Sequence, residues 1–425
     1  MLTAPRRAIA ETVSGLPRAF WWLWTSTLIN RLGGFVVTYL ALYLTVQRGF
    51  SASYAGLVAA LYGLGGTVGA LVGGVLSDRI GRRSTMLTAQ LGAAATTAVL
   101  GLVTHPVAIA AAACAVGVTS NASRPAVQAV MADVVPDRDR VRAFSLNYWA
   151  INIGFGVSAA VAGVIAAHGY LLLFLGDAAT TLLCALVVFT RIPETRPAAA
   201  VAAKDKPAGE RPAGLSRVLR DGRFMAVVGL TFLLGTVTQQ GSNTLAVAMG
   251  RSGLTSAEYG LVIGVNGLLI VVLQIPLTRL MQGRDRGTLL LVASVLLGGG
   301  FGLTFFATAP WFYALTVVVW TLGEIAHAPT SMSVVAELSP VEARGRYQGM
   351  YSLAWSAATF AGPLAGGVAL DRWGAAMWPA CAVIGVVVGV GYRVLLRGRR
   401  AAVREGAVAA AQVSPGAATG DAAPR

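Results

Sequence analysis

Long apolar segments follow one another along almost the whole of this 425-residue chain. A helix crosses a lipid bilayer with roughly 20 apolar residues, and we count twelve segments of about that length. Their approximate ranges are 19–46, 53–77, 85–104, 107–133, 143–168, 170–191, 223–249, 257–281, 288–307, 310–337, 346–370 and 373–396. Because 56% of the residues are hydrophobic and only 12% are charged, the chain is predicted to be an all-α polytopic membrane protein.

The basic residues lie in alternate loops between these segments. Clusters surround Arg82, Arg140 and Arg284, whereas the opposite loops hold only Arg48, Arg251 and Arg372. This positive-inside pattern predicts a multi-pass protein with both termini cytoplasmic. It also accounts for the net charge of +15 without a nucleic-acid partner. The abundance of Ala, Gly, Val and Arg indicates a bacterial source, and therefore the bacterial plasma (inner) membrane.

The two halves of the chain align without gaps at a shift of 204 residues. Asp133 then meets Glu337, and an ordered series of further pairs keeps the same offset: Gly56 with Gly260, Gly63 with Gly267, Pro125 with Pro329, Pro136 with Pro340, Arg140 with Arg344, Arg142 with Arg346 and Gly163 with Gly367. Such a repeat predicts two six-helix bundles in the same orientation, related by a pseudo-two-fold axis along the membrane normal. A cavity between the bundles and transport by alternating access are expected.

Four parts follow from the repeat and from local composition. We expect an N-terminal bundle over 1–192, a cytoplasmic linker over 193–222, a C-terminal bundle over 223–400 and a disordered cytoplasmic tail over 401–425. The linker is rich in Ala, Pro, Lys and Arg, and the tail lacks a pattern that could form a core. The protein is expected to be a monomer.

The sequence Gly-x-x-x-Asp-Arg-x-Gly-Arg-Arg at 74–83, together with the repeat, resembles the major facilitator superfamily. The resemblance implies that this loop latches one conformer shut on the cytoplasmic side, with Asp78 at the N-terminus of the eleventh helix. Gly74 would allow close helix approach and Gly81 a tight turn. Its basic residues would be charge partners in the latch or only topology anchors: Arg79, Arg82 and Arg83. A worn second copy at 278–286 makes the latch asymmetric.

Two acidic residues at repeat-related helix ends are candidates for further gate ion pairs. Asp133 precedes Arg140 and Arg142, and Glu337 precedes Arg344 and Arg346 at matching spacing. We expect Asp133, Arg142, Glu337 and Arg346 to belong to the cytoplasmic gate. The alternative is that these charges are only solvated at the surface.

Few ionisable residues fall inside the predicted helices, where an unpaired charge costs a few kcal/mol or more. They are the candidates for proton coupling: Arg31, Arg124, Asp177, Glu324 and His327. Glu324 is the leading candidate for the proton carrier, since an apolar medium favours the neutral form of a carboxyl group. A static ion pair of Glu324 with Arg31 or Arg124 is the alternative. Asp177 could instead face a helix interface or lie near the cytoplasmic or periplasmic rim. His327, on the same helical face as Glu324, could assist Glu324 or be only a packing residue.

Substrate-cavity candidates are amide and aromatic residues that fall in the predicted helices, a lining suited to bulky and partly apolar molecules. They are Asn30, Asn147, Tyr148, Asn152, Gln239, Gln240, Asn243, Asn266 and Trp355.

Three short motifs make the chain similar to bacterial multidrug-resistance members of this superfamily: Asn30-Arg31-Leu32-Gly33, Gly323-Glu324 and Gly362-Pro363. Arg124, followed by Pro125 and Gln128, also resembles the helix-4 arginine motif of the family. The resemblance implies that Arg124 takes part in proton coupling. The exporter motif Gly-Pro-x-x-Gly-Gly is altered in helix 5 and stands at 362–367 in helix 11 instead.

The first functional hypothesis is a proton-coupled efflux antiporter of hydrophobic or amphipathic small molecules. It would use the proton gradient as its energy source and no cofactor, and it would not be an enzyme. The second is a proton symporter that imports a sugar, organic acid or peptide. A membrane enzyme or sensor is a third class, but the sequence contains neither a nucleotide-binding loop nor a grouping of its three histidines that suggests a metal site.

Overall fold

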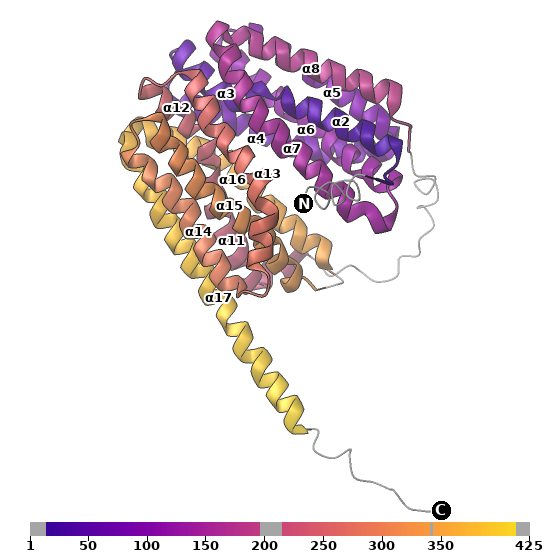
Figure 1. The fold of residues 1–425 in the computed structure, drawn as a ribbon, viewed down its shortest axis with the longest axis vertical. Helices are drawn as coiled ribbons and strands as arrows, with labels where there is room; N and C mark the ends of the chain where they lie inside the picture. Colours follow the sequence, from indigo (N-terminus) through magenta and orange to yellow (C-terminus); the bar gives the residue numbers. More distant parts are fainter. Residues whose placement is uncertain (1–13, 196–214, 341–342, 414–425) are drawn as a thin grey trace, which may run out of the picture.

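Every regular element in the described part of the chain is helical (Figure 1). The computed structural model describes residues 14–195, 215–340 and 343–413. The first half contains α2 (Arg18–Leu32), α3 (Phe35–Leu42), η1 (Tyr43–Gln47), α4 (Ala52–Ile80), α5 (Arg82–Leu102), α6 (Pro106–Val134), η2 (Asp137–Asp139), α7 (Arg140–His168) and α8 (Tyr170–Arg191). The second contains α10 (Leu215–Arg220), α11 (Gly222–Thr238), η4 (Gln239–Gly241), α12 (Thr244–Arg251), α13 (Ser256–Met281), α14 (Arg286–Leu303), η5 (Thr304–Phe306), α15 (Pro310–Leu338), α16 (Arg344–Trp373), η7 (Gly374–Met377) and α17 (Trp378–Val413).

These elements form twelve membrane-length segments. Ten stretches are long and apolar enough to cross a membrane, and one of them, Arg344–Arg397, contains both α16 and most of α17. The remaining segment is the 29-residue helix α15. The predicted all-α architecture with twelve transmembrane helices is therefore confirmed.

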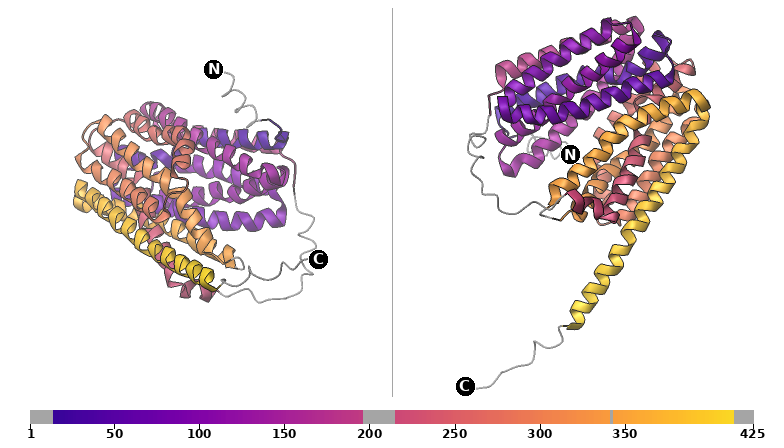
Figure 2. Two further views of the ribbon diagram at one scale, coloured as in Figure 1. Left: turned by 60° about the horizontal axis from the view of Figure 1, so that its bottom comes forward. Right: turned by 180° about the vertical axis from the view of Figure 1, so that it is seen from behind.

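The helices form two bundles, α2–α8 and α10–α17, which meet along two crossed helix pairs (Figure 2). Helix α4 packs on α16, and α7 packs on α13. A Cβ on Gly367 would lie 2.3 Å from the backbone oxygen of Ala52, and one on Gly163 would lie 2.8 Å from that of Ser256. These two contacts are related by the 204-residue shift. The repeat seen in the sequence is thus also a repeat of contacts.

The bundles touch at one end and separate at the other. At the touching end, where α4 begins and α16 finishes, a Cβ on Gly56 would lie 2.3 Å from the Pro363 oxygen. Nothing lies within 4 Å of a Cβ built on Gly74, Gly345 or Gly349, at the other ends of the same two helices. Figure 2 shows the two bundles diverging in that direction. We call the touching end the Asp371 end and the separated end the arginine-rich end.

The first segment of each bundle is broken at nearly repeat-related positions. The first bends at Gly33 and Gly34, between α2 and α3, and the seventh changes to the 3-10 turn η4 between α11 and α12. A Cβ on Gly33 would collide with the Thr180 side chain of α8. Close packing of α8 therefore accounts for the glycine at the first break.

Two of the expected domain boundaries differ from the helix ends. Helix α17 continues to Val413 instead of ending near Arg400, since the Ala-rich sequence there has high helix propensity. Within the expected linker, Leu215–Arg220 forms α10. Residues 196–214 and 414–425 of the linker and tail lie outside the described residues.

Replacing Gly69 with alanine should destabilise the N-terminal bundle. Its Cβ would lie 2.0 Å from the Val118 oxygen of α6, and neither backbone can move away without opening the α4–α6 contact. Overpacking of this kind costs about 1–3 kcal/mol, so the midpoint of thermal unfolding in detergent should fall. Gly229→Ala in α11 is the matched control, because nothing lies within 4 Å of its added Cβ. Equal midpoints for the two variants would contradict the packing argument.

Candidate functional site

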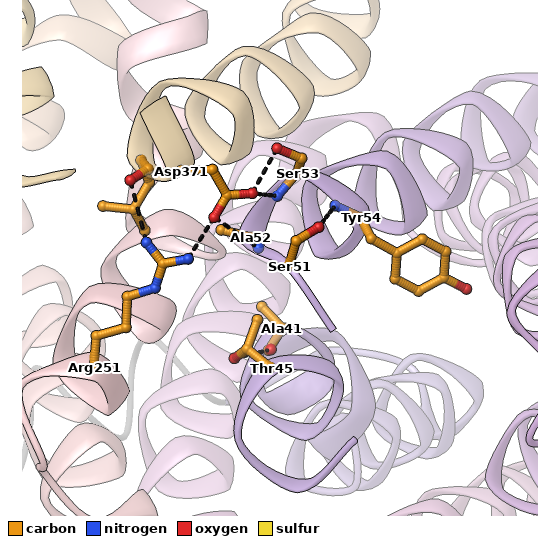
Figure 3. A network of polar contacts seen from close by, with 9 residues as sticks. Ala41, Thr45, Ser51, Ala52, Ser53, Tyr54, Arg251 and Asp371 are labelled. Atoms are coloured by element: carbon orange, nitrogen blue, oxygen red, sulfur yellow. Dashed lines mark hydrogen bonds and ion pairs between the residues drawn. The ribbon is translucent and has the colours of Figure 1, made fainter. Parts of the chain in front are cut away.

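One carboxylate joins the two bundles at the Asp371 end (Figure 3). Asp371, in the last turn of α16, accepts hydrogen bonds from the backbone N–H of Ala52 at 3.2 Å and from that of Ser53 at 2.6 Å. The Ser53 hydroxyl donates a third bond at 2.6 Å. Arg251 of α12 forms an ion pair with the same carboxylate and donates to the Leu370 carbonyl.

These contacts make Asp371 a helix cap supplied by the opposite bundle. The first N–H groups of α4 have no partners within their own helix, and the partial positive charge at a helix N-terminus favours a carboxylate. Charge-assisted hydrogen bonds contribute about 1.5–3 kcal/mol each when they are shielded from water, and less at a partly exposed site such as this one. The cap therefore stabilises the closed Asp371 end.

Among the described residues, no carboxylate joins the two bundles at the repeat-related contact. Tyr39 of α3 donates to the backbone oxygen of Ser256 at 3.0 Å and to that of Ala159 at 2.8 Å, and the Tyr170 hydroxyl lies 2.8 Å from Ser256 Oγ. Glu258 caps its own helix through Thr255. At this end the two bundle contacts therefore have the same close packing, but only one of them includes a carboxylate.

Asp371 was not among the residues expected from the sequence. The available signal was a lone carboxylate at the end of an apolar segment, with Arg251 in a loop predicted on the same side of the membrane. Nothing in the sequence connects it to Ser53, which lies 318 positions away.

At the arginine-rich end, the signature loop binds within its own bundle. Arg82 pairs with Asp133 and donates to the Ala129 oxygen. Glu194, which follows α8, accepts a 2.8 Å bond from the Arg82 N–H at the start of α5. Gly81 has φ +96°, a conformation unfavourable for other residues. Sequence reasoning missed Glu194, whose role as a cap depends on the α8 end lying beside the loop.

The second bundle repeats one of these contacts at the same offset. Arg286 pairs with Glu337, as Arg82 pairs with Asp133. The expected partners of Asp133 are corrected here: Arg140 bonds the Ala132 oxygen and Asp137, and Arg142 lies 3.3 Å from Asp139. The reason is that the ends of α6 and α15 pack beside the starts of α5 and α14, which the linear spacing does not reveal. Arg346 lies partly buried near the start of α16.

The Asp78 latch is not engaged in this conformation. Asp78 is exposed, and nothing approaches Gly74. Arg83 lies over the Phe189 ring of α8, 5.2 Å from its centroid. In the second half Asp285 caps α14 through a 3.0 Å bond from the Thr288 N–H, so the worn loop copy keeps a cap within its own bundle. The role of Asp78, Arg79 and Arg83 in a latch stays a prediction for the other conformer.

Three of the ionisable residues expected inside the membrane line one cavity inside the N-terminal bundle. Its volume is about 90 Å³, and Arg31, Arg124 and Asp177 are in its wall, with Asn30 and Gln90. Asp177 accepts a 3.2 Å bond from the Val36 N–H, where α3 restarts after the break. Its carboxylate therefore caps the start of α3, and a part for Asp177 in proton coupling stays a prediction.

Glu324 lies in the other bundle, on α15. Its carboxylate accepts a 3.0 Å hydrogen bond from the Asn266 amide of α13, which also donates to Thr321. The Tyr148 phenol of α7 lies close enough to interact electrostatically, which places Glu324 near the interface between bundles. Within the described residues no ion pair involves Glu324. The static pair with Arg31 or Arg124 is therefore absent from this conformation.

His327 has different neighbours from Glu324. The His327 side chain is buried, with 3% of its surface exposed. Its ring centroid lies 6.0 Å from that of Tyr392 in α17. No hydrogen bond joins it to Glu324 in the part of the chain that the structure describes. Its part in proton coupling stays a prediction.

The expected cavity residues separate into two groups. Some side chains are bonded within their own bundle: Asn152 donates to the Tyr148 oxygen at 2.8 Å, and Gln240 donates to the Gly362 oxygen at 3.0 Å. Others have partly buried or exposed side chains: Asn30, Asn147, Tyr148, Gln239 and Trp355. Asn243 lies at the start of α12, beside Ala52 and Pro363 at the bundle contact. The described residues contain no group of three or more His, Cys, Asp or Glu side chains that could hold a metal ion.

Asp371→Ala should loosen the Asp371 end, because it removes the carboxylate that joins α16 to α4 and Arg251. Spin labels would be attached at positions 48 and 372 in a background lacking the native cysteines. In the distribution of distances between the two labels, the population at longer distance should grow severalfold. Glu258→Gln is the control, since Glu258 caps a helix at the same end but within one bundle. A distance distribution unchanged by Asp371→Ala, or changed equally by both variants, would contradict the role of this cap.

Comparison with known proteins agrees with this architecture. The family model described as Major Facilitator Superfamily matches residues 23–333 and 240–420. The uncharacterised MFS-type transporter YttB of Bacillus subtilis is 29% identical, covering 84% of this chain and 90% of YttB. A Na(+), Li(+), K(+)/H(+) antiporter of Planococcus maritimus is 22% identical, covering 80% and 85%. The structure of the nucleoside transporter NupG aligns with a TM-score of 0.76 at 15% identity, covering 89% of this chain and all of NupG. The chain belongs to the major facilitator superfamily and is a membrane transporter of that type.

Proposed function

We propose that this transporter is a proton-coupled antiporter that exports amphipathic small molecules across the bacterial inner membrane by alternating access. The observation that carries the proposal is the setting of Glu324. It is a partly buried carboxylate that accepts a hydrogen bond from an amide, lies near a phenol, and forms no ion pair among the described residues. A charged group in such surroundings is costly unless it is neutralised.

Proton binding is the simplest way to neutralise Glu324. The neutral carboxyl group can stay in apolar surroundings with little desolvation cost while the protein changes conformer, whereas the carboxylate is favoured when water reaches it. Because Glu324 lies near α7 of the opposite bundle, relative movement of the bundles changes its exposure to water. Loading and release of a proton would therefore be linked to the conformational cycle.

The orientation follows from the charge distribution. The positive-inside rule assigns the arginine-rich end to the cytoplasm, which makes this conformation inward-facing and closed toward the outside by Asp371. In the outward-facing conformer, closure at the cytoplasmic side would bring the start of α16 to Asp78. The two carboxylates would then cap helices of opposite bundles in alternation, Asp371 in one conformer and Asp78 in the other.

Relatives add support for a proton as the coupling ion. One relative is named as a cation/H(+) antiporter. The amide and aromatic residues near the interface between bundles, such as Asn147, Tyr148 and Trp355, suit a partly apolar substrate. A net inward flow of substrate together with protons would instead establish a symporter.

Glu324→Gln should abolish proton-driven transport while substrate exchange continues, because glutamine keeps the shape and cannot carry a proton. Proteoliposomes containing a pH-sensitive dye would be tested with tetraphenylphosphonium, ethidium and 2-naphthoate, and then with whichever probe the wild type moves. Loss of proton movement by tenfold or more, with counterflow within about twofold, is expected. Glu258→Gln is the control carboxylate. Full proton-driven transport by Glu324→Gln would refute the assignment.

Asp78→Asn should slow turnover and leave substrate affinity within about twofold of wild type, since the residue stabilises one conformer and binds no substrate. The measurement is counterflow velocity against substrate concentration in the same proteoliposomes. Asp137→Asn, at another exposed position of the same end, is the control. A changed affinity with unchanged maximal rate would show that Asp78 acts in binding instead.

A further inference from the structure

We propose that the cavity between Arg31 and Arg124 binds the carboxylate of the transported molecule, so that the substrates are amphipathic monocarboxylates. The inference rests on the proposed transport function and adds the chemical class of the substrate. It concerns binding only, and does not depend on whether Glu324 carries the proton.

The first support is the uncompensated charge of the cavity. Arg31 and Arg124 lie close enough to repel each other, and no ion pair involves either residue within the described part of the chain. The remaining charged residue of the lining, Asp177, is engaged by the Val36 N–H at 3.2 Å and faces Thr181 at 3.5 Å. One positive charge is therefore left unbalanced. An unbalanced guanidinium charge inside a membrane protein is costly, and a bound anion removes that cost.

The second support is a pair of polar atoms that lack partners. Arg31 Nε is buried and donates no hydrogen bond, and Gln90 Oε1, in a side chain only 7% exposed, accepts none. Both residues line this cavity. Buried polar groups are nearly always satisfied, so a ligand or water that bonds Arg31 Nε, with a hydroxyl directed to Gln90, completes the site.

The third support is access and size. Arg124 is exposed, although it lies in the middle of α6, and its Nη1 is held 3.3 Å from Asn121 Oδ1. The cavity is thus reached from outside the bundle. Its volume of about 90 Å³ accommodates a small head group rather than a whole bulky molecule. The planar guanidinium group matches a carboxylate in shape, and the single unbalanced charge favours a monoanion over a dianion.

Direct binding to the purified full-length protein tests this inference. The protein would be placed in nanodiscs of phosphatidylcholine, so that no anionic lipid head group competes, and titrated at pH 7 without a pH gradient. The probes are 2-naphthoate, the neutral 2-naphthamide, the cation 2-naphthylmethylammonium and the dianion 2-naphthyl phosphate. The wild type should bind naphthoate at least tenfold more tightly than the other three. Equal or tighter binding of the amide or cation would overturn the anion site, and tighter binding of the phosphate would overturn the assignment to monocarboxylates.

Arginine variants locate the site. Arg31→Gln and Arg124→Gln should each weaken naphthoate binding by tenfold or more and leave naphthamide within about twofold. Arg31→Lys, which keeps the charge but loses the fork of donors, should restore part of the preference. Arg279→Gln, at an exposed position of α13, is the matched control. If Arg31→Gln does not fold, the exposed Arg124 still provides the measurement. Retention of the naphthoate preference by both glutamine variants would overturn the proposal.

The result of the binding experiment can be distinguished from the result that tests the proposed function. Failure of Glu324→Gln to lose proton-driven transport would refute proton coupling and leave the binding result standing. Loss of the naphthoate preference in wild type would refute the anion site and leave proton coupling standing.

Discussion

Close backbone contact along α4–α16 and α7–α13 is the interaction on which the conformation of this transporter depends. In a bilayer, burial of apolar side chains between helices gains little, because lipid tails are equally apolar. Helices associate instead through tight packing, which requires a missing side chain at the contact. Gly56 and Gly367 supply this on one crossed pair, and Gly163 and Gly260 on the other. Because the close contacts lie at one end of the helices, the bundles are joined there and are free to separate at the other end.

Packing in this molecule follows the internal repeat, and its charges follow the repeat only in part. The ion pairs Arg82–Asp133 and Arg286–Glu337 correspond at the 204-residue offset, and each stays within a bundle. The contact that joins the bundles by charge, through Asp371, has no equivalent at the repeat-related position. The two bundles therefore pack symmetrically, but the charged contact that closes one end of the interface between them is present only once among the described residues. Such an arrangement lets the energy of one conformer be changed without altering the packing of either bundle.

The ionisable residues of the membrane-spanning helices are divided between the bundles. Arg31, Arg124 and Asp177 surround a cavity in the first, and Glu324 lies with Asn266 in the second. Sequence reasoning grouped them as one set for proton coupling, with a possible pair between Glu324 and an arginine. Their separation supports two distinct tasks, an anion site in one bundle and a proton site in the other. Relative movement of the bundles would then change both sites together.

The sequence by itself determined the membrane character, the twelve helices, the repeat and the identity of the residues that are costly to bury, because hydrophobic length, charge distribution and internal similarity are local or periodic properties. Only the tertiary structure decided which of those residues meet. Asp371 caps a helix that begins over 300 positions earlier, Glu194 caps α5 from beyond α8, and Asp133 pairs with Arg82 instead of the nearer arginines. A carboxylate can satisfy any helix N-terminus or guanidinium group within reach. Its partner is therefore set by how the helices pack, which the order of residues along the chain does not state.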